Sequence, residues 1–497
     1  MRRKLSLGGG AIALAAYVVV PAAHAQTAVE PPTPPQQLPA VQVTGTPTFP
    51  ERNLLPGTTV GITAQQIEET INVVNVEDAL KYFPSIVIRK RHIGDVQAPI
   101  QTRTSGLGQS ARSLIYADGV LLSALIGNNN TSASPRWGMV APAEVDRIDV
   151  MYGPFAAAFP GNSIGTIVEI TTHMPKQLEA TAEVLAATQN FKQYGTAGTY
   201  NAYQANATVG NRTGDFSYWL SANYTDSHSQ PLAIVTALRP ASPSAAGTPV
   251  LGAYADSNRL GQPIVDIGAG GFEHQQEGTF KFKLAYDFTP TLRATYTVGL
   301  FQQENDATVQ SYITDGAGNP VYSGNLNILG YNYNIPASSF SNNYYNLNED
   351  LIAQSLVLRS NTGGTFDWEA VGSYFNWNNS TLRTPTAAIP VAQNGGPGII
   401  TSMDGTGWWN GDVKGFWRPQ GGTGATQVTF GAHYDRYALV SPKYLTDNWI
   451  SGGQGPLSSD ARGKTQTTAV WLQDVWRVAP DWTTTLGGRY EWWQAFD

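Results

Sequence analysis

One serine of the sequence stands in the spacing that esterases use for a nucleophile. Residues 161–165, Gly-Asn-Ser-Ile-Gly, fit the pattern Gly-x-Ser-x-Gly, in which a strand before the serine and a helix after it expose a strained nucleophile. Here Pro160 precedes the pattern, and the residues after it alternate as they do in a strand. We therefore interpret the glycines as a turn and expect no catalysis at Ser163.

Metal and redox chemistry have little support in the sequence either. The chain has six histidines and no cysteine, which excludes disulfides and cysteine-ligated metals. The histidines show no spacing typical of metal ligands. His433 alternates with polar residues, and we expect it to face a polar interior. The sequence thus predicts no enzyme, no cofactor and no metal site.

Charge and composition narrow the class of protein. The formal net charge is -7, and no basic stripe is present to bind phosphates, so nucleic acid is not an expected partner. Charged residues make up 13% of the chain, against about 25% in ordinary soluble domains. The 51 glycines and 11% aromatic residues suit the turns and interfacial girdles of an outer-membrane barrel.

The first 25 residues have the features of a secretory signal peptide. Three basic residues at positions 2–4 precede an apolar stretch at 5–20, and Ala23-His24-Ala25 is a small-residue cleavage site. We predict export and cleavage before Gln26. Residues 26–57 are then rich in proline and poor in large apolar side chains, so we expect an extended leader without a core.

Residues 58–176 predict a small α+β domain. Thr63 and Gln66 have the spacing of a capping box at the start of a helix, and a second short helix is expected over residues 76–83. Asp118-Gly119 between two apolar runs predicts a hairpin. Further strands are expected at residues 86–88, 145–151 and 164–172.

From residue 177 to residue 497 the pattern changes to long strands with apolar residues at every second position. Such a run spans residues 280–288 and resumes at residues 292–300, after Thr289-Pro290, which predicts a hairpin. Similar runs bring the expected number of strands to about eleven. They lie at residues 203–209, 216–224, 366–375, 428–436 and 483–493.

The connections between these strands indicate a transmembrane antiparallel β-barrel. Turns of a few residues alternate with loops of roughly 30 to 50 residues, as in outer-membrane barrels. The mean hydropathy is -0.22, and no run approaches the roughly 18 consecutive apolar residues that a spanning helix needs. Both observations are compatible with a membrane protein, because barrel strands have apolar residues at every second position only. Because single-chain bacterial barrels have even strand numbers, the odd count predicts a fragment that lacks its C-terminal half and does not insert or transport alone.

Tryptophans cluster in the predicted barrel strands. We expect most of them to belong to an interfacial girdle rather than to stack on a ligand. The residues concerned are Trp408, Trp409, Trp417, Trp471, Trp476, Trp492 and Trp493.

Three stretches of the α+β region match the motifs of a known family. They are residues 79–86 (ALKYFPSI), residues 114–120 (LIYADGV) and residues 144–154 (EVDRIDVMYGP). In this order they resemble the segment before the first plug strand, the Asp-Gly hairpin and the most diagnostic stretch of the TonB-dependent receptors. Tyr152 departs from the family's usual arginine, and Thr166 departs from its usual double glycine.

The resemblance implies a plug domain inside a barrel of about twenty-two strands, of which about eleven are present. It also implies import of a scarce ligand across the outer membrane of a Gram-negative cell. The segment Val41-Gln42-Val43-Thr44, whose alternation suits pairing with another strand, would be the TonB box. The implied partners are TonB with its inner-membrane energising complex, outer-membrane lipid and the ligand.

The family's ligands meet the apical loops of the plug, which by position are residues 89–95, 105–110 and 126–137. Side chains there offer charge, hydrogen bonds and stacking to a polar ligand. The candidates are Arg91, His92, Gln109, Asn129 and Trp137. A ferric siderophore is the expected cargo, while an oligosaccharide, cobalamin or another metal chelate stays open.

Two other classes of function are weighed against import. A passive outer-membrane channel would lack both the plug and the TonB box. An outer-membrane phospholipase would need a serine and a histidine on one strand face, and we find no such pair.

Overall fold

The computed structural model describes residues 57–106, 111–125, 134–153, 156–422, 424–479 and 482–496. The chain divides into the units Met1–Thr44 and Gly45–Asp497, and all described residues belong to the second. The predicted signal peptide, nearly all of the leader, and the proposed TonB box therefore lie outside the described residues, as do Gln109 and Asn129.

An inner unit is built on a five-stranded sheet of order β1-β6-β7-β4-β5. Only the β4–β7 pair is parallel. The strands of this sheet are β1 Thr59–Thr63, β4 Leu114–Ala117, β5 Val120–Leu121, β6 Val145–Met151 and β7 Ile167–Thr172, and a separate pair is formed by β2 Ile86–Ile88 and β3 Ile100–Thr102. The predicted strands and the Asp-Gly hairpin are thus confirmed.

Short helices connect these strands. The predicted capping box is present: α1, Ala64–Thr70, begins after Thr63, whose hydroxyl accepts from the Gln66 amide. The second predicted helix is present as a 3-10 helix, η2 Val76–Tyr82, and Asp78 accepts from the amides of residues 74 and 75 at its start. Further 3-10 helices in the described residues of the unit are η4 Trp137–Met139, η5 Pro142–Glu144 and η6 Gly161–Ser163. Ser163 thus lies in a 3-10 turn, without the strand and helix of a nucleophile elbow.

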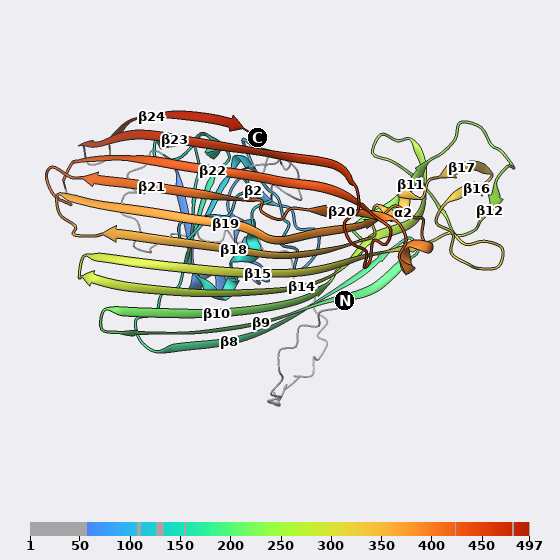
Figure 1. The fold of residues 1–497 in the computed structure, drawn as a ribbon, viewed down its shortest axis with the longest axis horizontal. Helices are drawn as coiled ribbons and strands as arrows, with labels where there is room; N and C mark the ends of the chain where they lie inside the picture. The colour runs from blue at the N-terminus through green and yellow to red at the C-terminus, as the bar shows by residue number, and fades with distance from the viewer. Residues whose placement is uncertain are drawn as a thin grey trace, which may run out of the picture. The chain divides into compact units, whose positions relative to one another are not determined.

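A curved sheet follows, with eleven strands in succession in the described residues (Figure 1). Its order from one edge to the other is β8-β9-β10-β14-β15-β18-β19-β20-β22-β23-β24, and β21 continues the position of β20. The predicted number is confirmed. Their bounds are β8 Glu179–Gln193, β9 Thr196–Thr213, β10 Phe216–His228, β14 Pro263–Thr289, β15 Leu292–Ser311, β18 Tyr345–Ser360, β19 Phe366–Pro385, β20 Gly398–Ser402, β21 Gly407–Trp417, β22 Thr426–Thr446, β23 Leu457–Ala479 and β24 Trp482–Phe496.

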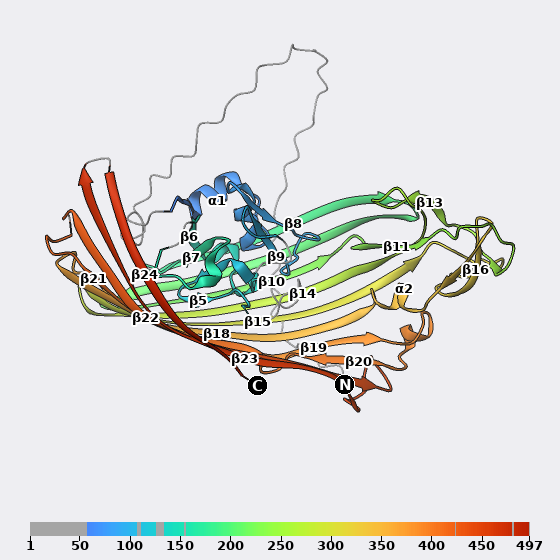
Figure 2. The ribbon, with the colours of Figure 1, turned by 90° about the horizontal axis from the view of Figure 1, so that it is seen from above.

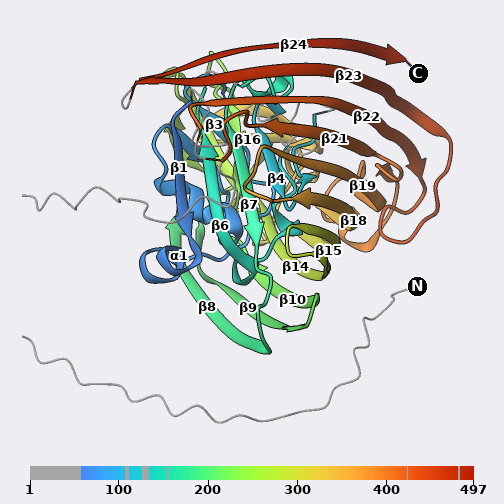
Figure 3. The ribbon, with the colours of Figure 1, turned by 90° about the vertical axis from the view of Figure 1, so that its left-hand side faces the viewer.

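The sheet arches around the inner unit without closing on itself (Figure 3): among the described residues, β8 and β24 stand at opposite edges of the strand order. The inner unit lies on the concave side (Figure 2). Strands alternate as predicted. Phe280 is exposed on the convex side, while Lys281 and Lys283 are buried on the concave side.

One end of the curved sheet carries the short turns, and we call it the turn end; the other carries the long connections, and we call it the loop end. At the loop end a second hydrophobic core includes Ile267, Ile313 and Phe340. The elements there are β11 Ala233–Leu238, β12 Thr248–Pro249, β13 Tyr254–Ser257, β16 Gly324–Ile328, β17 Tyr331–Ile335, α2 Ser338–Ser341 and η7 Val391–Asn394. Among the described residues, no helix is long and apolar enough to cross a membrane.

Five of the seven tryptophans that were considered for the interfacial girdle are exposed, and two are not. Trp408 and Trp471 are buried, whereas Trp409, Trp417, Trp476, Trp492 and Trp493 are exposed as expected. Trp408 faces inward because each residue of a strand points opposite to its neighbour, and Trp409 takes the outward position. Its indole packs in the main core, which the inner unit and the curved sheet share.

Candidate functional site

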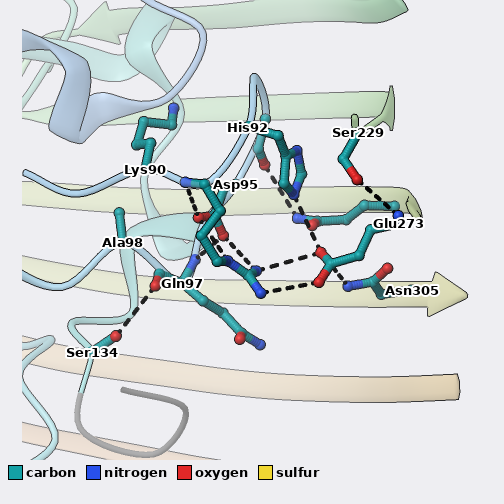
Figure 4. A network of polar contacts seen from close by, with 12 residues as sticks. Lys90, His92, Asp95, Gln97, Ala98, Ser134, Ser229, Glu273 and Asn305 are labelled. Atoms are coloured by element: carbon teal, nitrogen blue, oxygen red, sulfur yellow. Dashed lines mark hydrogen bonds and ion pairs between the residues drawn. The ribbon is translucent and has the colours of Figure 1, made fainter. Parts of the chain in front are cut away.

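The inner unit meets the curved sheet through buried polar side chains, and toward the loop end these contacts centre on Arg91. Its guanidinium donates to Asp95, with Nη2–Oδ1 at 2.8 Å, and to Glu273 of β14, with Nη1–Oε1 at 2.9 Å. Because Arg91 binds one carboxylate of its own loop and one of β14, it links the loop to the curved sheet, which we call the wall. Figure 4 shows this network.

Glu273 is the acceptor that collects the donors of this network. Besides Arg91, it is contacted by His92 with Nε2–Oε2 at 3.2 Å, by Asn305 of β15 with Nδ2–Oε2 at 2.9 Å, and by the Tyr345 hydroxyl of β18. The carboxylate is fully buried. A buried charge is tolerated only when it is paired and hydrogen-bonded, and these four donors meet that need.

Asp95 binds both the backbone and the Arg91 side chain of its own loop. Burial alone would raise the pKa of Asp95, but the Arg91 guanidinium and its hydrogen bonds hold that pKa well below its usual range. The same carboxylate accepts from the backbone amides of Arg91 at 2.9 Å and Gln97 at 3.0 Å. Asp95 therefore fixes both the loop backbone and the direction of the Arg91 side chain.

The wall also binds the backbone of this loop. Gln230 Nε2 donates to the carbonyl of Arg91 at 2.7 Å, and Gln275 Nε2 donates to that of Gly94 at 3.1 Å. The Ser227 hydroxyl donates to the carbonyl of Ile93. Polar side chains of β10, β14 and their connection thus satisfy carbonyls that the loop itself leaves open.

A second polar cluster lies at the start of η2. Lys90 Nζ lies 3.1 Å from Asp78 Oδ2 and 3.4 Å from Glu77 Oε1. Burial raises the pKa of Glu77 from 4.5 to about 7, with Lys90 opposing and Asp78 adding to the shift. Lys90 thus lies closer to Asp78 than to Glu77. Of the two carboxyl groups, Glu77 is the one whose protonated form is favoured in the folded state.

This raised pKa predicts how stability depends on pH. Because folded Glu77 keeps its proton up to about pH 7 and the unfolded carboxyl loses it near 4.5, the contribution is fully present below the lower value and is lost as pH rises through the higher one. Glu77→Gln should flatten this part of the profile, measured as thermal midpoints between about pH 5 and about pH 8.

The exposed Glu68 of α1 offers the matched control. Glu68→Gln should have the same pH dependence of the thermal midpoint as the unmodified protein. An unchanged slope in Glu77→Gln would show that another group carries the dependence.

Toward the turn end, two lysines of β14 bind the inner unit. Lys281 pairs with Glu144 of η5, and Lys283 Nζ lies 3.0 Å from Asp118 Oδ2. Burial alone would raise the pKa of Asp118, but Lys283 and Lys281 hold it below its usual value. Asp118 also accepts from the Thr172 amide at 3.0 Å. The aspartate of the hairpin turn therefore anchors β7 and the wall together.

An aromatic contact joins the same hairpin to the wall. Trp408 of β21 donates from Nε1 to the carbonyl of Leu121 at 2.9 Å. Its ring stacks on Phe375 of β19, with centroids 4.3 Å apart and 6° between the planes. Trp377 and Tyr437 surround this pair, with centroids 5.6 and 6.0 Å from Trp408.

A cavity of about 970 Å³ lies between the inner unit and the wall beside Asp118 and Lys283. Its lining carries both signs of charge, and most of these groups pair with one another. Arg293 binds Asp287 with Nε–Oδ1 at 2.6 Å, and Lys414 binds Glu369 with Nζ–Oε1 at 3.0 Å. The lining therefore offers a polar space rather than a surface of one charge.

The structure brings together two of the five predicted ligand contacts. Arg91 and His92 converge on Glu273, where the Arg91 side chain is 31% exposed and that of His92 is buried. Trp137 is buried elsewhere and donates to the carbonyl of Ala98 at 2.8 Å. Sequence reasoning did not identify Glu273 as a site residue, because in the sequence it is only one of several residues on the polar face of a strand.

Two family models match this chain. Residues 51–167 match the TonB-dependent Receptor Plug Domain, and residues 300–497 match the TonB dependent receptor-like, beta-barrel. Together the matched stretches cover more than half of the chain. A search of curated proteins found no match.

Several solved structures are similar to this one. The unliganded ferric citrate transporter FecA has a TM-score of 0.59 at 14% identity, covering 89% of this chain and 57% of FecA. A variant of the ferric enterobactin receptor PfeA from Pseudomonas aeruginosa has 0.54 at 15%, covering 87% and 57%. The copper transporter OprC has 0.55 at 12%, covering 87% and 54%. At these identities the likeness concerns the fold alone, and this chain spans little more than half the length of each.

Proposed function

Because this chain belongs to the family of TonB-dependent receptors, we propose that it acts in the energised import of a scarce ligand across the outer membrane of a Gram-negative cell. The observation that carries the proposal is the seating of the inner unit, the plug, on the polar face of the curved sheet. Ion pairs such as Arg91–Glu273 and Lys283–Asp118 hold the plug at both ends. Water can replace such contacts individually, so the plug can be held firmly and still be displaced.

Energy would enter through Val41, Gln42, Val43 and Thr44, paired by their backbone with a strand of TonB. In the part of the chain that the structure describes, the first element of the plug is β1, an edge strand that pairs with β6 alone over five residue pairs. A pull on the leader would reach β1 before any other strand of the plug. We propose residues 58–176 as the plug and residues 177–497 as the barrel part of this chain.

The proposed cargo is a ferric siderophore. The similar structures support this choice, since FecA is described as a ferric citrate transporter and PfeA as a ferric enterobactin receptor. The copper transporter OprC has the same fold, so the cargo has to be tested directly. Among the predicted contacts, Arg91 is the candidate for direct contact, and buried His92 and Trp137 would position the loops; Gln109 and Asn129 stay candidates by their position in the chain.

Uptake of radioactive iron tests this function in cells that lack their own ferric-siderophore receptors. Because the described wall is not closed, the cells produce this chain as part of a complete barrel, and they should then take up iron with at least one siderophore of a panel. Val43→Pro should abolish uptake while leaving binding intact, because proline removes a backbone donor from the pairing strand. Val43→Ala keeps that donor and should retain uptake.

The other classes of function give different results. Uptake that persists in Val43→Pro would identify a passive channel and overturn energised import. Uptake of an oligosaccharide or cobalamin in place of iron, still lost in Val43→Pro, would overturn the cargo and leave the transport class standing.

A further inference from the structure

Two strands carry titratable groups on the convex face of the barrel wall, beyond its apolar band. On β10, Asp226 and His228 continue the outward face of exposed Tyr224. On β14, His274 and Gln276 continue the outward face of exposed Phe280. These groups therefore point away from the plug and from the polar network around Glu273.

The strand register places three of these side chains side by side. His228 stands directly opposite His274, and Asp226 stands opposite Gln276. His274 Nε2 lies 3.3 Å from each oxygen of Asp226, and His228 Nδ1 lies 3.6 Å from Asp226 Oδ1. The two imidazole rings stack with centroids 4.0 Å apart and 17° between their planes.

This geometry matches the spacing of ligands around one metal ion. One nitrogen of each histidine and one oxygen of Asp226 all lie within 4.8 Å of one another. With metal–ligand bonds of about 2.1 Å, two ligands of a tetrahedral Zn²⁺ are about 3.4 Å apart. The distances of 3.3 and 3.6 Å bracket that value. Because the two rings are stacked with 17° between their planes, the imidazoles have to turn about their side-chain torsions to direct one nitrogen each at the same ion.

A neighbouring side chain orients the carboxylate. Gln276 Nε2 donates to Asp226 Oδ2 at 2.9 Å and to the Tyr224 hydroxyl at 3.1 Å. Outer groups that hold a ligating carboxylate are a regular feature of metal sites. Gln276 thus fixes one oxygen of Asp226 and leaves Oδ1 directed toward both histidines.

We propose that Asp226, His228 and His274 form a binding site for a divalent cation of the zinc type on the outer wall of the barrel. Two imidazoles and one carboxylate are ligands that suit Zn²⁺ and its neighbours in the first transition row. The side chains are 26%, 53% and 38% exposed, so a fourth position is open to solvent. The site faces away from the lumen and is independent of the imported cargo.

Among the described residues, the histidines outside this cluster lack this arrangement. His173 has Nε2 3.0 Å from Glu179 and Nδ1 3.8 Å from Asp146, and His433 likewise has one carboxylate at each ring nitrogen. The two nitrogens of an imidazole point in different directions, so two carboxylates held in this way cannot share one ion. His173, half-buried and paired with two acids, is therefore a matched control.

The test is a titration of the purified, detergent-solubilised protein with Zn²⁺ after removal of metals with EDTA, followed by competition with a chromophoric chelator. One strong equivalent is expected. His228→Ala and His274→Ala should each weaken it by at least about tenfold, since even orienting residues are worth about 10- to 100-fold. Gln276→Ala should weaken it less, and His173→Ala should leave it unchanged.

Asp226→Asn removes the charge with little change of shape and guards against a folding defect, which circular dichroism would reveal. Equal affinity in the unmodified protein and in His228→Ala, His274→Ala and Asp226→Asn would overturn the proposal, as would the absence of a strong equivalent. Iron uptake should be unchanged in His228→Ala. The Zn²⁺ titration and the uptake assay therefore test the metal site and the transport function independently.

Discussion

Trp408→Ala is expected to lower the free energy of unfolding by about 3–5 kcal/mol. Trp408 is fully buried and is flanked in the strand register by Phe375 on one side and Tyr437 on the other. Removing the indole leaves a cavity between them and takes the hydrogen-bond donor from the buried carbonyl of Leu121. The β4–β5 hairpin would lose its aromatic attachment to the wall, so thermal unfolding in detergent should begin at a lower temperature.

Trp409 supplies the matched control. It is the next residue of the same strand, is 56% exposed on the convex face, and contacts Tyr374 with ring centroids 4.2 Å apart. Trp409→Ala should change stability by less than about 1 kcal/mol. Trp408→Phe keeps most of the ring but not the donor and should cost about 1 kcal/mol. Equal losses in Trp408→Ala and Trp409→Ala would contradict the assigned attachment.

Glu273→Gln should release the plug loop at residues 89–95 from the wall. The amide loses the negative charge that faces Arg91 and His92, and it cannot accept from all four donors. Breaking a buried pair usually costs about 3–5 kcal/mol, and because Asp95 still binds Arg91 we expect about 2–3 kcal/mol here. Hydrogen exchange of the loop amides should then be faster by about 30- to 150-fold.

Glu304 of the adjacent strand β15 is exposed on the opposite face, so Glu304→Gln should leave this exchange unchanged. Faster exchange throughout the plug in Glu273→Gln, rather than at residues 89–95, would show that Glu273 supports the whole fold instead of this loop.

Elements whose signal is local could be predicted from the sequence. The β14–β15 hairpin follows from apolar residues at every second position and the break at Thr289-Pro290, and its register pairs Phe282 with Val298. The capping box at Thr63 and the turn at Asp118-Gly119 depend on neighbouring residues alone. The second short helix expected over residues 76–83 is also present, as a 3-10 helix over Val76–Tyr82.

Sites that join distant segments could not be predicted in the same way. Arg91 and Glu273 are 182 positions apart, and nothing near either residue indicates the other. Trp137 was expected on an apical loop, but a single sequence does not show that the loop folds back to place its indole against Ala98. The histidines lacked metal-ligand spacing along the chain because the register of β10 with β14 alone unites His228 and His274.

The alternation of β14 has a consequence for how this protein can vary in evolution. Glu273 and His274 are consecutive, yet one faces the plug and the other the surroundings, while Lys281 and Lys283 repeat the inward direction further along. Loss of a single codon between positions 274 and 280 would turn both lysines toward the convex face and the intervening phenylalanine toward the plug. Insertions and deletions tolerated within β14 should therefore come in pairs of residues. In the long connections at the loop end, an odd number of inserted or deleted residues should be tolerated as well as an even number.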